Sequence, residues 1–308
     1  MDNYGIIDMG SNTIRMVIYA VDCKGKTKKG ARIFTSLLSD KVFAGLAAYV
    51  DDGVFTQAGI DKAIKVLKGH LKRSKYYKCK KMEVIATAVL RNCSNRDDAV
   101  RQISKECNIP IRVLSEYEEA YLGFVGASSA ESIGNGTLLD IGGGSTELTR
   151  VLEGYPRTSV SLPQGSLSSF SMYVEGVFPS EAEMKTIRAE MRKQCEALPS
   201  SRIFRTDSFF GIGGSIRGAA KVLQQMDKLK KRPDRITHDD LWRICDLSLT
   251  NPNAFVHIAA AAVPERIHTI IPGCLIALEL MELMNASHIE ICKHGLREGY
   301  LLEYLLKG

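Results

Sequence analysis

Two short segments, far apart in the chain, share a pattern that suits phosphate chemistry. Each is an apolar run that ends in an aspartate and a glycine-containing turn with Ser or Thr, and a β-rich run follows. The first is Ile7-Asp-Met-Gly-Ser-Asn-Thr13 and the second is Leu139-Asp-Ile-Gly-Gly-Gly-Ser-Thr-Glu147. Glycine lets backbone N–H groups approach an anion closely and point at it. A single copy could be an ordinary hairpin, but the repetition favours two loops that grip a chain of phosphates from both sides.

The residue types within the two segments predict separate tasks. Asp8 and Asp140, each at the end of the first strand of its segment, are the metal candidates, because carboxylate oxygens hold divalent cations directly or through water. Hydroxyl, amide and backbone donors would bind phosphate oxygens; these are Ser11, Asn12, Thr13, Gly142, Gly143, Gly144, Ser145 and Thr146.

Two arginines could add bidentate phosphate contacts. Arg15 lies on the strand just after the first loop, and Arg91 follows a buried strand in Ala86-Thr-Ala-Val-Leu-Arg91. A surface salt bridge is the alternative role for either.

Two glutamates are candidates for catalysis. Glu147 follows the triple-glycine turn closely enough to reach back toward a metal or an attacking water, although it could also face outward from its strand. Ser115 and Glu118 fit the S-x-x-E capping box, in which Glu118 only bonds the start of a helix. A general base on a rigid helix would look the same in sequence, so the residues alone leave the role of Glu118 open.

A third glycine-rich turn, Gly211-Ile-Gly-Gly-Ser-Ile-Arg217, follows a predicted strand and opens a predicted helix. Gly213, Gly214 and Ser215 could bind an anion at that helix N-terminus, or the turn could serve packing alone. It does not fit the G-x-G-x-x-G dinucleotide fingerprint, because position 216 is Ile.

Hydrophobic spacing and turn residues predict the elements that position these loops. A helix is expected from Thr56, as N-cap, to Tyr76. Further strands are expected near 4–8, 13–21, 30–36, 82–86, 111–114 and 209–214. Further helices are expected over 97–107, 115–128, 180–197 and 215–231. The end of the chain, 257–308, is expected to be mostly helical. The polar stretch 128–136 is the predicted boundary, after which the strand–turn–strand theme restarts. We therefore expect an α/β protein of two domains, 1–128 and 129–296, with a cleft between them, and leave open whether a C-terminal helix, 297–308, packs back on the first.

The composition is that of an ordinary globular protein. The chain has 308 residues, of which 45% are hydrophobic and 25% charged, and it contains no apolar stretch of the ~20 residues that span a membrane. It begins directly with a strand, so no signal peptide is expected. The 8 cysteines are scattered without a CxxC pair, which argues against a zinc knot and suits a reducing cytoplasm.

The net charge of +6 is mild but uneven. Lysine and arginine crowd residues 62–81, and a second basic cluster occupies 228–235. Either is a solvated surface or a track for a polyanion; nucleic acid is disfavoured, because few aromatic residues are interleaved and no recognition fold is visible.

Together these segments resemble the exopolyphosphatase / guanosine pentaphosphate phosphohydrolase family, within the actin-like ATPase and sugar kinase superfamily. Besides the two aspartate–glycine segments, the matching pieces are Ala86–Arg91, Glu118-Glu-Ala120, Leu162-Pro-Gln-Gly165, Gly211–Arg217 and His294-Gly-Leu-Arg-Glu-Gly299. They occur in the family's order and cover nearly the whole chain.

The resemblance implies two ribonuclease-H-like domains and Mg²⁺-dependent hydrolysis of a terminal phosphoanhydride in the cytoplasm. By position, Glu118 matches the family's proposed catalytic base and Glu147 its second catalytic carboxylate, while Asp140 belongs to the phosphate and metal loop. Ser168 stands where family members often carry an arginine, and the helical HD-type domain of longer members is missing, which puts long-chain processivity in doubt.

The expected substrate is polyphosphate or a guanosine polyphosphate, with no specific nucleic acid or membrane partner and with a homodimer left open. The alternatives are a sensor that binds polyphosphate or guanosine tetraphosphate with little turnover, and a kinase of the same superfamily.

Overall fold

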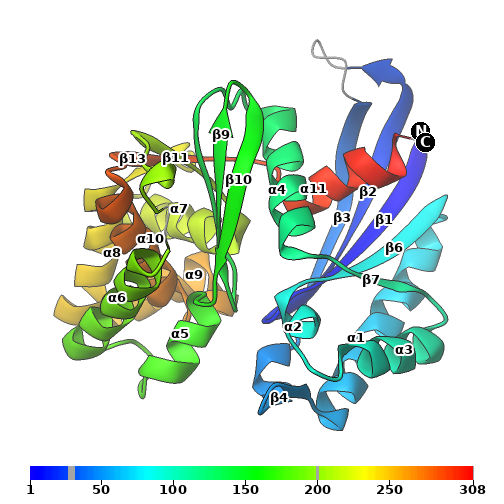
Figure 1. The fold of residues 1–308 in the computed structure, drawn as a ribbon, viewed down its shortest axis with the longest axis horizontal. Helices are drawn as coiled ribbons and strands as arrows, with labels where there is room; N and C mark the ends of the chain where they lie inside the picture. Colours follow the sequence, from blue (N-terminus) through cyan, green and yellow to red (C-terminus); the bar gives the residue numbers. More distant parts are fainter. Residues whose placement is uncertain (27–31, 199–200, 308) are drawn as a thin grey trace. The chain divides into compact units, whose positions relative to one another are not determined.

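The computed structural model describes residues 1–26, 32–198 and 201–307, and the chain divides into two compact units (Figure 1). Unit 1 comprises Met1–Ser129 and Leu296–Gly308, and unit 2 comprises Ala130–Gly295. Each unit is built on its own mixed β-sheet with helices packed on it, which confirms the predicted two-domain α/β class.

Unit 1 contains a five-stranded sheet in the order β3-β2-β1-β6-β7. The strands are β1 (Asp2–Met9), β2 (Thr13–Lys26), β3 (Arg32–Phe43), β6 (Lys81–Ala86) and β7 (Ile111–Val113). β1, β2 and β3 form an antiparallel meander, and β6 and β7 continue the sheet parallel to β1. The small hairpin β4 (Val50–Asp51) and β5 (Val54–Phe55) stands apart. Strand β3 extends beyond the predicted 30–36, of which residues 30 and 31 lie outside the described residues.

Successive residues of a strand point to opposite faces of the sheet. Apolar side chains therefore lie on both faces, and helices cover both. One face packs with α1 (Gln57–Ser74) and α3 (Arg96–Cys107) through Ile60, Leu67 and Ile103. The other packs with α4 (Glu116–Ala130), α11 (Leu296–Tyr300) and the π-helical turn Leu301–Leu305. Thr56 caps α1 as predicted, since its hydroxyl accepts from the N–H of Gly59 at 3.3 Å.

Unit 2 repeats this succession of strands. Its sheet has the order β10-β9-β8-β11-β13-β12. The strands are β8 (Gly136–Ile141), β9 (Thr146–Leu152), β10 (Tyr155–Leu162), β11 (Ser208–Ile212), β12 (Arg235–Thr237) and β13 (His288–Ile291). β8, β9 and β10 are an antiparallel meander, β11 and β13 run parallel to β8, and β12 closes the edge antiparallel to β13. The restart of the strand–turn–strand theme after residue 136 is therefore a repeat of topology.

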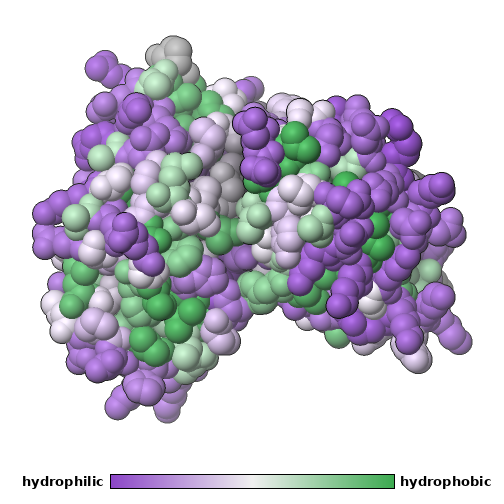
Figure 2. Space-filling model, turned by 90° about the horizontal axis from the view of Figure 1, so that it is seen from below, coloured by the Kyte–Doolittle hydropathy of each residue, from purple (hydrophilic) through white to green (hydrophobic). Residues whose placement is uncertain are grey.

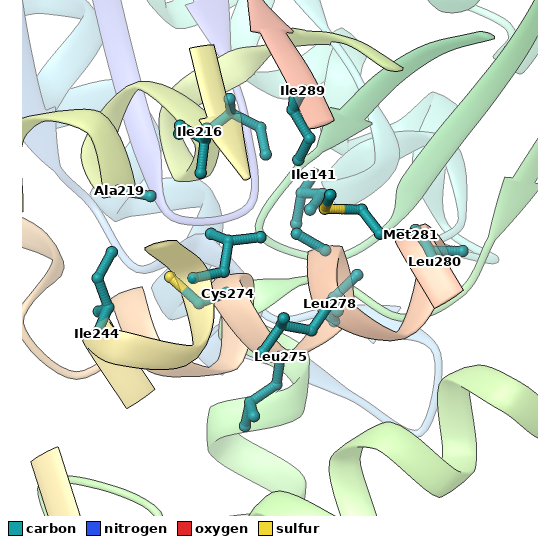
Figure 3. Packing of buried hydrophobic residues seen from close by; sticks show 14 of the residues in the cluster. Ile141, Ile216, Ala219, Ile244, Cys274, Leu275, Leu278, Leu280, Met281 and Ile289 are labelled. Carbon is teal, nitrogen blue, oxygen red and sulfur yellow. The ribbon is translucent and has the colours of Figure 1, made fainter. Parts of the chain in front are cut away.

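One large apolar cluster holds the helices of unit 2 to the sheet (Figure 3). The helices are α5 (Ser166–Tyr173), α6 (Glu181–Glu196), α7 (Gly213–Met226), α8 (His238–Thr250), α9 (Pro252–Ala262) and α10 (Ile270–Met284). Figure 3 shows Ile216 and Ile289 beside the Ile141 side chain, and Cys274 and Leu278 of α10 below them. α10 is buried almost all round, as its predominantly apolar sequence requires.

The structure of unit 2 differs from the sequence expectations in several places. α7 ends at Met226, before the basic residues 228–231 that were placed in the helix. β10 and α5 were not predicted, because β10 is half-exposed and lacks a strong apolar alternation. β13 lies inside the region expected to be mostly helical; a strand of 4 residues beside a long apolar helix leaves too short a pattern to recognise.

The visible surface is mainly hydrophilic, with scattered apolar residues (Figure 2). Among the helices of the described chain, none combines the length and the apolar character that crossing a membrane requires.

Candidate functional site

The two aspartate–glycine segments form the same turn. In the first, the Gly10 N–H donates to the Thr13 carbonyl at 3.0 Å; in the second, the Gly142 N–H donates to the Ser145 carbonyl at 2.9 Å. The two residues between these ends are Ser11 and Asn12 in one turn and Gly143 and Gly144 in the other. Within the described part of the chain, the N–H groups of these middle residues have no acceptor. Each turn therefore offers a pair of backbone donors to an anion.

The carbonyl groups of both turns are fixed by the segment that follows each meander. In unit 2, the Gly142 carbonyl accepts from the N–H of Ser166, and the Gly143 carbonyl accepts from the N–H groups of Leu167 and Ser168, all at 2.9 Å. These donors are the first turn of α5, so the helix start holds the glycine turn in place. Gly165 is required here, because a β-carbon at this position would lie 2.6 Å from the Gly143 carbonyl.

In unit 1 the carbonyl groups of the turn are also held by backbone N–H groups of the segment after the meander, but the residues differ. The Asn12 carbonyl accepts from the N–H groups of Ala44 and Gly45, at 3.1 and 2.9 Å, and the Ser11 carbonyl accepts from Ala47 at 2.9 Å. Both predicted loops are therefore rigid turns with their carbonyls occupied and their middle N–H groups available.

Two predicted carboxylates come together in unit 2. Asp140 on β8 is directly opposite Glu147 on β9 in the antiparallel ladder, so the two side chains share one face of the sheet. Glu147 is buried, and its Oε1 accepts from the hydroxyl groups of Ser145 at 2.6 Å and Ser161 at 2.9 Å. The alternative of an outward-facing Glu147 is thus wrong for this structure, whereas its catalytic role stays a prediction.

The third glycine-rich turn lies against the same carboxylates. Gly213 begins α7 with a left-handed φ of 82°, and a β-carbon there would overlap Oδ1 of Asp140. No side chain caps α7, so its first N–H groups form an anion-binding terminus. The Ser215 hydroxyl donates to the Ile141 carbonyl at 2.9 Å, so Ser215 ties α7 to β8 instead of pointing its hydroxyl at a ligand.

Arg266 is a candidate that the sequence reasoning missed. It ends the short 3₁₀ turn Pro264–Arg266, and its guanidinium covers Gly214 so closely that a β-carbon there would overlap it. This places a cation at the N-terminus of α7. A single arginine in a turn between helices has no spacing that would reveal it in the sequence.

Asp8 has a different environment from Asp140. Its Oδ2 accepts from Nη1 of Arg297 at 2.7 Å, and both side chains are mostly buried. Burial acts against the charge of Arg297, but Asp8 and Glu298 outweigh it and raise the pKa of Arg297. Asp8 thus already has a cationic partner. Its predicted metal role stays untested, and we leave it out of the metal site proposed below.

The two predicted arginines of unit 1 differ in burial and in partners. Nε of Arg15 donates to the Ser39 hydroxyl at 2.8 Å. The Arg91 side chain is only 9% exposed and pairs through Nη1 with Glu119 at 2.5 Å. Its Nε and Nη2 are buried and have no hydrogen-bond partner in the described chain. Because unpaired buried donors are costly, this arginine fits a bound anion better than a surface salt bridge.

Glu118 forms the capping box that its spacing predicts. Its Oε2 accepts from the N–H and hydroxyl of Ser115, both at 2.9 Å, and the Ser115 hydroxyl accepts from the Glu118 N–H at 3.2 Å. Its Oε1 pairs with Arg112 at 2.6 Å. Burial acts to raise the pKa of Glu118, but the hydrogen bonds from Ser115 and Arg112 together lower it. Glu118 is therefore ionised at neutral pH, so it can accept a hydrogen bond from water.

The basic run over residues 62–81 is partly neutralised. Lys68 pairs with Glu106, Arg73 with Asp40, Lys80 with Asp2 and Lys81 with Glu83. Within the described residues, no ion pair involves Lys62, Lys65, Lys72, Lys75 or Lys78. Lys65 and Lys72 are exposed on the side of α1 opposite its buried residues, so they remain available to a polyanion.

Comparison with known proteins identifies the family. The model of the Ppx/GppA phosphatase family matches residues 25–308. The chain belongs to this family. Exopolyphosphatase 1 of Mycobacterium tuberculosis is 24% identical to it over 98% of this chain and 88% of that protein.

Solved structures share the fold of this Ppx/GppA family member. An exopolyphosphatase from Cytophaga hutchinsonii superposes with a TM-score of 0.82 at 20% identity, covering 100% of this chain and 98% of that one. The Ppx/GppA protein of Aquifex aeolicus gives a TM-score of 0.73 at 22% identity, covering 99% and 98%. These likenesses confirm the predicted two-domain α/β fold.

The donor set of unit 2 fits a hard divalent cation. Asp140 and Glu147 supply carboxylate oxygens from opposite positions of one ladder, and oxygen is the ligand that Mg²⁺ prefers. The described residues contain no group of three or more His, Cys, Asp or Glu side chains that could hold a metal. Two protein carboxylates suit Mg²⁺, which commonly keeps several waters and takes further oxygens from substrate phosphates.

Proposed function

We propose that this Ppx/GppA family member is a magnesium-dependent phosphohydrolase that releases the terminal phosphate of inorganic polyphosphate or guanosine pentaphosphate. The observation that carries the proposal is the repeated turn, in which Ser11 and Asn12 of one unit and Gly143 and Gly144 of the other present free backbone N–H groups. Two rigid pairs of donors suit a substrate with several neighbouring phosphates. Phosphoryl transfer asks a protein mainly for such positioning and for charge stabilisation.

The candidate residues have separate roles in the proposed reaction. The middle N–H groups of both turns, the first turn of α7 and the free nitrogens of Arg91 bind phosphate oxygens. Asp140 and Glu147 hold Mg²⁺, which would neutralise charge on the phosphoryl oxygens. Glu118 accepts a hydrogen bond from the attacking water and orients it for in-line attack. Its lowered pKa favours this orienting role over full removal of a proton before attack.

The test is release of inorganic phosphate from polyphosphate of several chain lengths, guanosine pentaphosphate and ATP, with and without Mg²⁺. We expect magnesium-dependent release from polyphosphate or guanosine pentaphosphate without any added acceptor. Binding measured by calorimetry on the same samples separates the alternatives.

Each other outcome contradicts the proposal in a defined way. Tight binding of polyphosphate without release would identify a sensor. Loss of phosphate from ATP only when an acceptor is added would identify a kinase. Release that is unchanged by removal of Mg²⁺ would leave a phosphohydrolase but refute the metal site.

A further inference from the structure

Arg112 lies between the candidate catalytic glutamate and the C-terminal end of the chain. It stands on β7, next to Ile85 of β6 in the parallel register. Its Nη2 is 2.6 Å from Oε1 of Glu118 and also donates to the Tyr304 hydroxyl at 2.9 Å. Its guanidinium stacks on the Tyr304 ring, with the central carbon 4.0 Å from the ring centre. The planar guanidinium thus contacts a carboxylate and an aromatic face at once.

With the contact to Arg112, both oxygens of the Glu118 carboxylate are held by hydrogen bonds. Oε2 is held by Ser115, and Oε1 is held by Arg112. A carboxylate held at both oxygens cannot rotate, yet each oxygen can accept more than one hydrogen bond. One acceptor position therefore remains for a water molecule in a direction set by Ser115 and Arg112.

The second anchor of Arg112 comes from the end of the chain. Tyr304 belongs to the π-helical turn Leu301–Leu305, and its ring lies 4.9 Å from that of Tyr300. Tyr300 in turn donates to Glu83 at 3.2 Å. Arg112 is thereby held by the C-terminal turn, which packs on the same face of the sheet as α4.

We propose that Arg112 is a positioning residue, which orients the Glu118 carboxylate toward the attacking water and makes this orientation depend on the C-terminal turn through Tyr304. The inference rests on the proposed function, in which Glu118 acts on water. We assign Arg112 a positioning role, and no contact with substrate, because its Nη2 is engaged by both Glu118 and Tyr304.

The charged groups around Glu118 support a specific effect on pH dependence. Arg112 and the Ser115 donors face its carboxylate, whereas the neighbouring Glu119 is paired with Arg91 and Lys307 with Glu303. Loss of Arg112 removes a group that lowers the pKa of Glu118, so this pKa rises. Because the ionised carboxylate is the active form, the acid limb of the kcat profile moves to higher pH.

The test compares Arg112→Gln with the wild-type enzyme by kcat and KM for polyphosphate from pH 5 to pH 9. We expect kcat to fall about tenfold at neutral pH, since small misplacement of a catalytic group is costly. KM should stay unchanged, and the acid limb should move to higher pH. Arg101→Gln is the matched control, because that arginine is exposed on α3 and pairs with Asp98; it should leave all three quantities unchanged.

Two further variants separate positioning from folding. Tyr304→Phe keeps the ring under the guanidinium but removes the hydroxyl, and we expect a smaller decrease of kcat with an unchanged melting temperature. In a Glu118→Gln background, Arg112→Gln should lower kcat no further, since the two residues act as one unit.

The outcomes distinguish the inference from the proposed function. If Glu118→Gln is inactive but Arg112→Gln keeps full kcat and the wild-type pH profile, only the positioning role fails. A raised KM in Arg112→Gln would show direct substrate binding and also refute it. A fully active Glu118→Gln would overturn the role of Glu118 and the inference with it.

Discussion

The two units have the same row of positions across their sheets, and each row begins with an aspartate, but the side chains beside that aspartate differ in charge. In unit 1, Asp8 of β1 lies opposite Arg15 of β2, which lies opposite Lys41 of β3. In unit 2, the matching row is Asp140, Glu147 and Ser161. The next strand of the row carries an isoleucine in both units, Ile85 and Ile212.

This difference gives the two aspartates different tasks. Asp8 has two cationic neighbours: Arg297 forms an ion pair with it, and Arg15 lies opposite it on β2. Asp140 stands opposite another carboxylate, and like charges directly opposite each other destabilise a sheet. Such a pair is most useful where a cation binds between the two. In the proposed mechanism, the repeated turn supplies phosphate donors in both units, whereas the charge of the neighbouring strand decides whether a unit could also hold a metal.

The largest expected effect concerns Glu118, the candidate catalytic carboxylate of unit 1. Glu118→Gln keeps an oxygen for part of the capping box but removes the charge that orients water. We expect kcat to fall by ~10²–10⁴ with the fold retained. Phosphate release and circular dichroism on the same preparation check this. A fully active variant would leave the capping box as the whole role of Glu118.

The second effect is on stability and contrasts the two aspartates. Asp8→Asn leaves Arg297 largely buried without its charged partner, so we expect a loss of ~3 kcal/mol in the free energy of unfolding. Asp140→Asn also relieves the opposition to Glu147, so we expect a smaller loss, of about 1 kcal/mol. Urea unfolding of both variants measures the difference. Equal losses would show that the two aspartates have the same structural role.

The third effect tests how tightly each turn is packed. A β-carbon at Gly165 would meet the backbone of Gly143 at 2.6 Å, whereas one at Gly10 would meet only the Thr13 carbonyl, at 3.5 Å. Gly165→Ala should therefore displace the unit 2 turn, lower the free energy of unfolding by ~2 kcal/mol and reduce kcat/KM about tenfold. Gly10→Ala should stay near wild type. The reverse order would contradict the packing described for the two turns.

The smallest effect concerns four lysines of α1 and of the turn after it, which form no ion pair within the described part of the chain. Changing Lys62, Lys65, Lys72 and Lys75 together to Gln should raise KM for long polyphosphate by roughly threefold and flatten its salt dependence, because counterion release scales with the charges paired. Short substrates should be unaffected. Loss of affinity for short and long chains alike, or for neither, would reduce this stretch to a solvated helix face.

Much of the fold could be predicted from the sequence because local signals agree with it. The Thr56 cap, the apolar spacing of α1 and the two aspartate–glycine turns each determine their own neighbourhood. The partners of the candidate residues could not be predicted in this way. Arg297 is far from Asp8 in sequence. Arg112 of β7 contacts both Glu118 and Tyr304 only because α4 and the C-terminal turn pack on the same face of the sheet. The opposition of Asp140 and Glu147 likewise depends on strand register, which the residue types alone do not show.

The central claim is that unit 2, through Asp140 and Glu147, holds the metal and that Asp8 does not. The most direct measurement is the Mg²⁺ concentration that gives half-maximal phosphate release in Asp140→Asn, Glu147→Gln and Asp8→Asn. The account predicts a higher requirement, or no turnover at any concentration, for the two unit 2 variants, and a wild-type requirement for whatever activity Asp8→Asn retains. An unchanged titration for both unit 2 variants, or a raised requirement in Asp8→Asn alone, would contradict it.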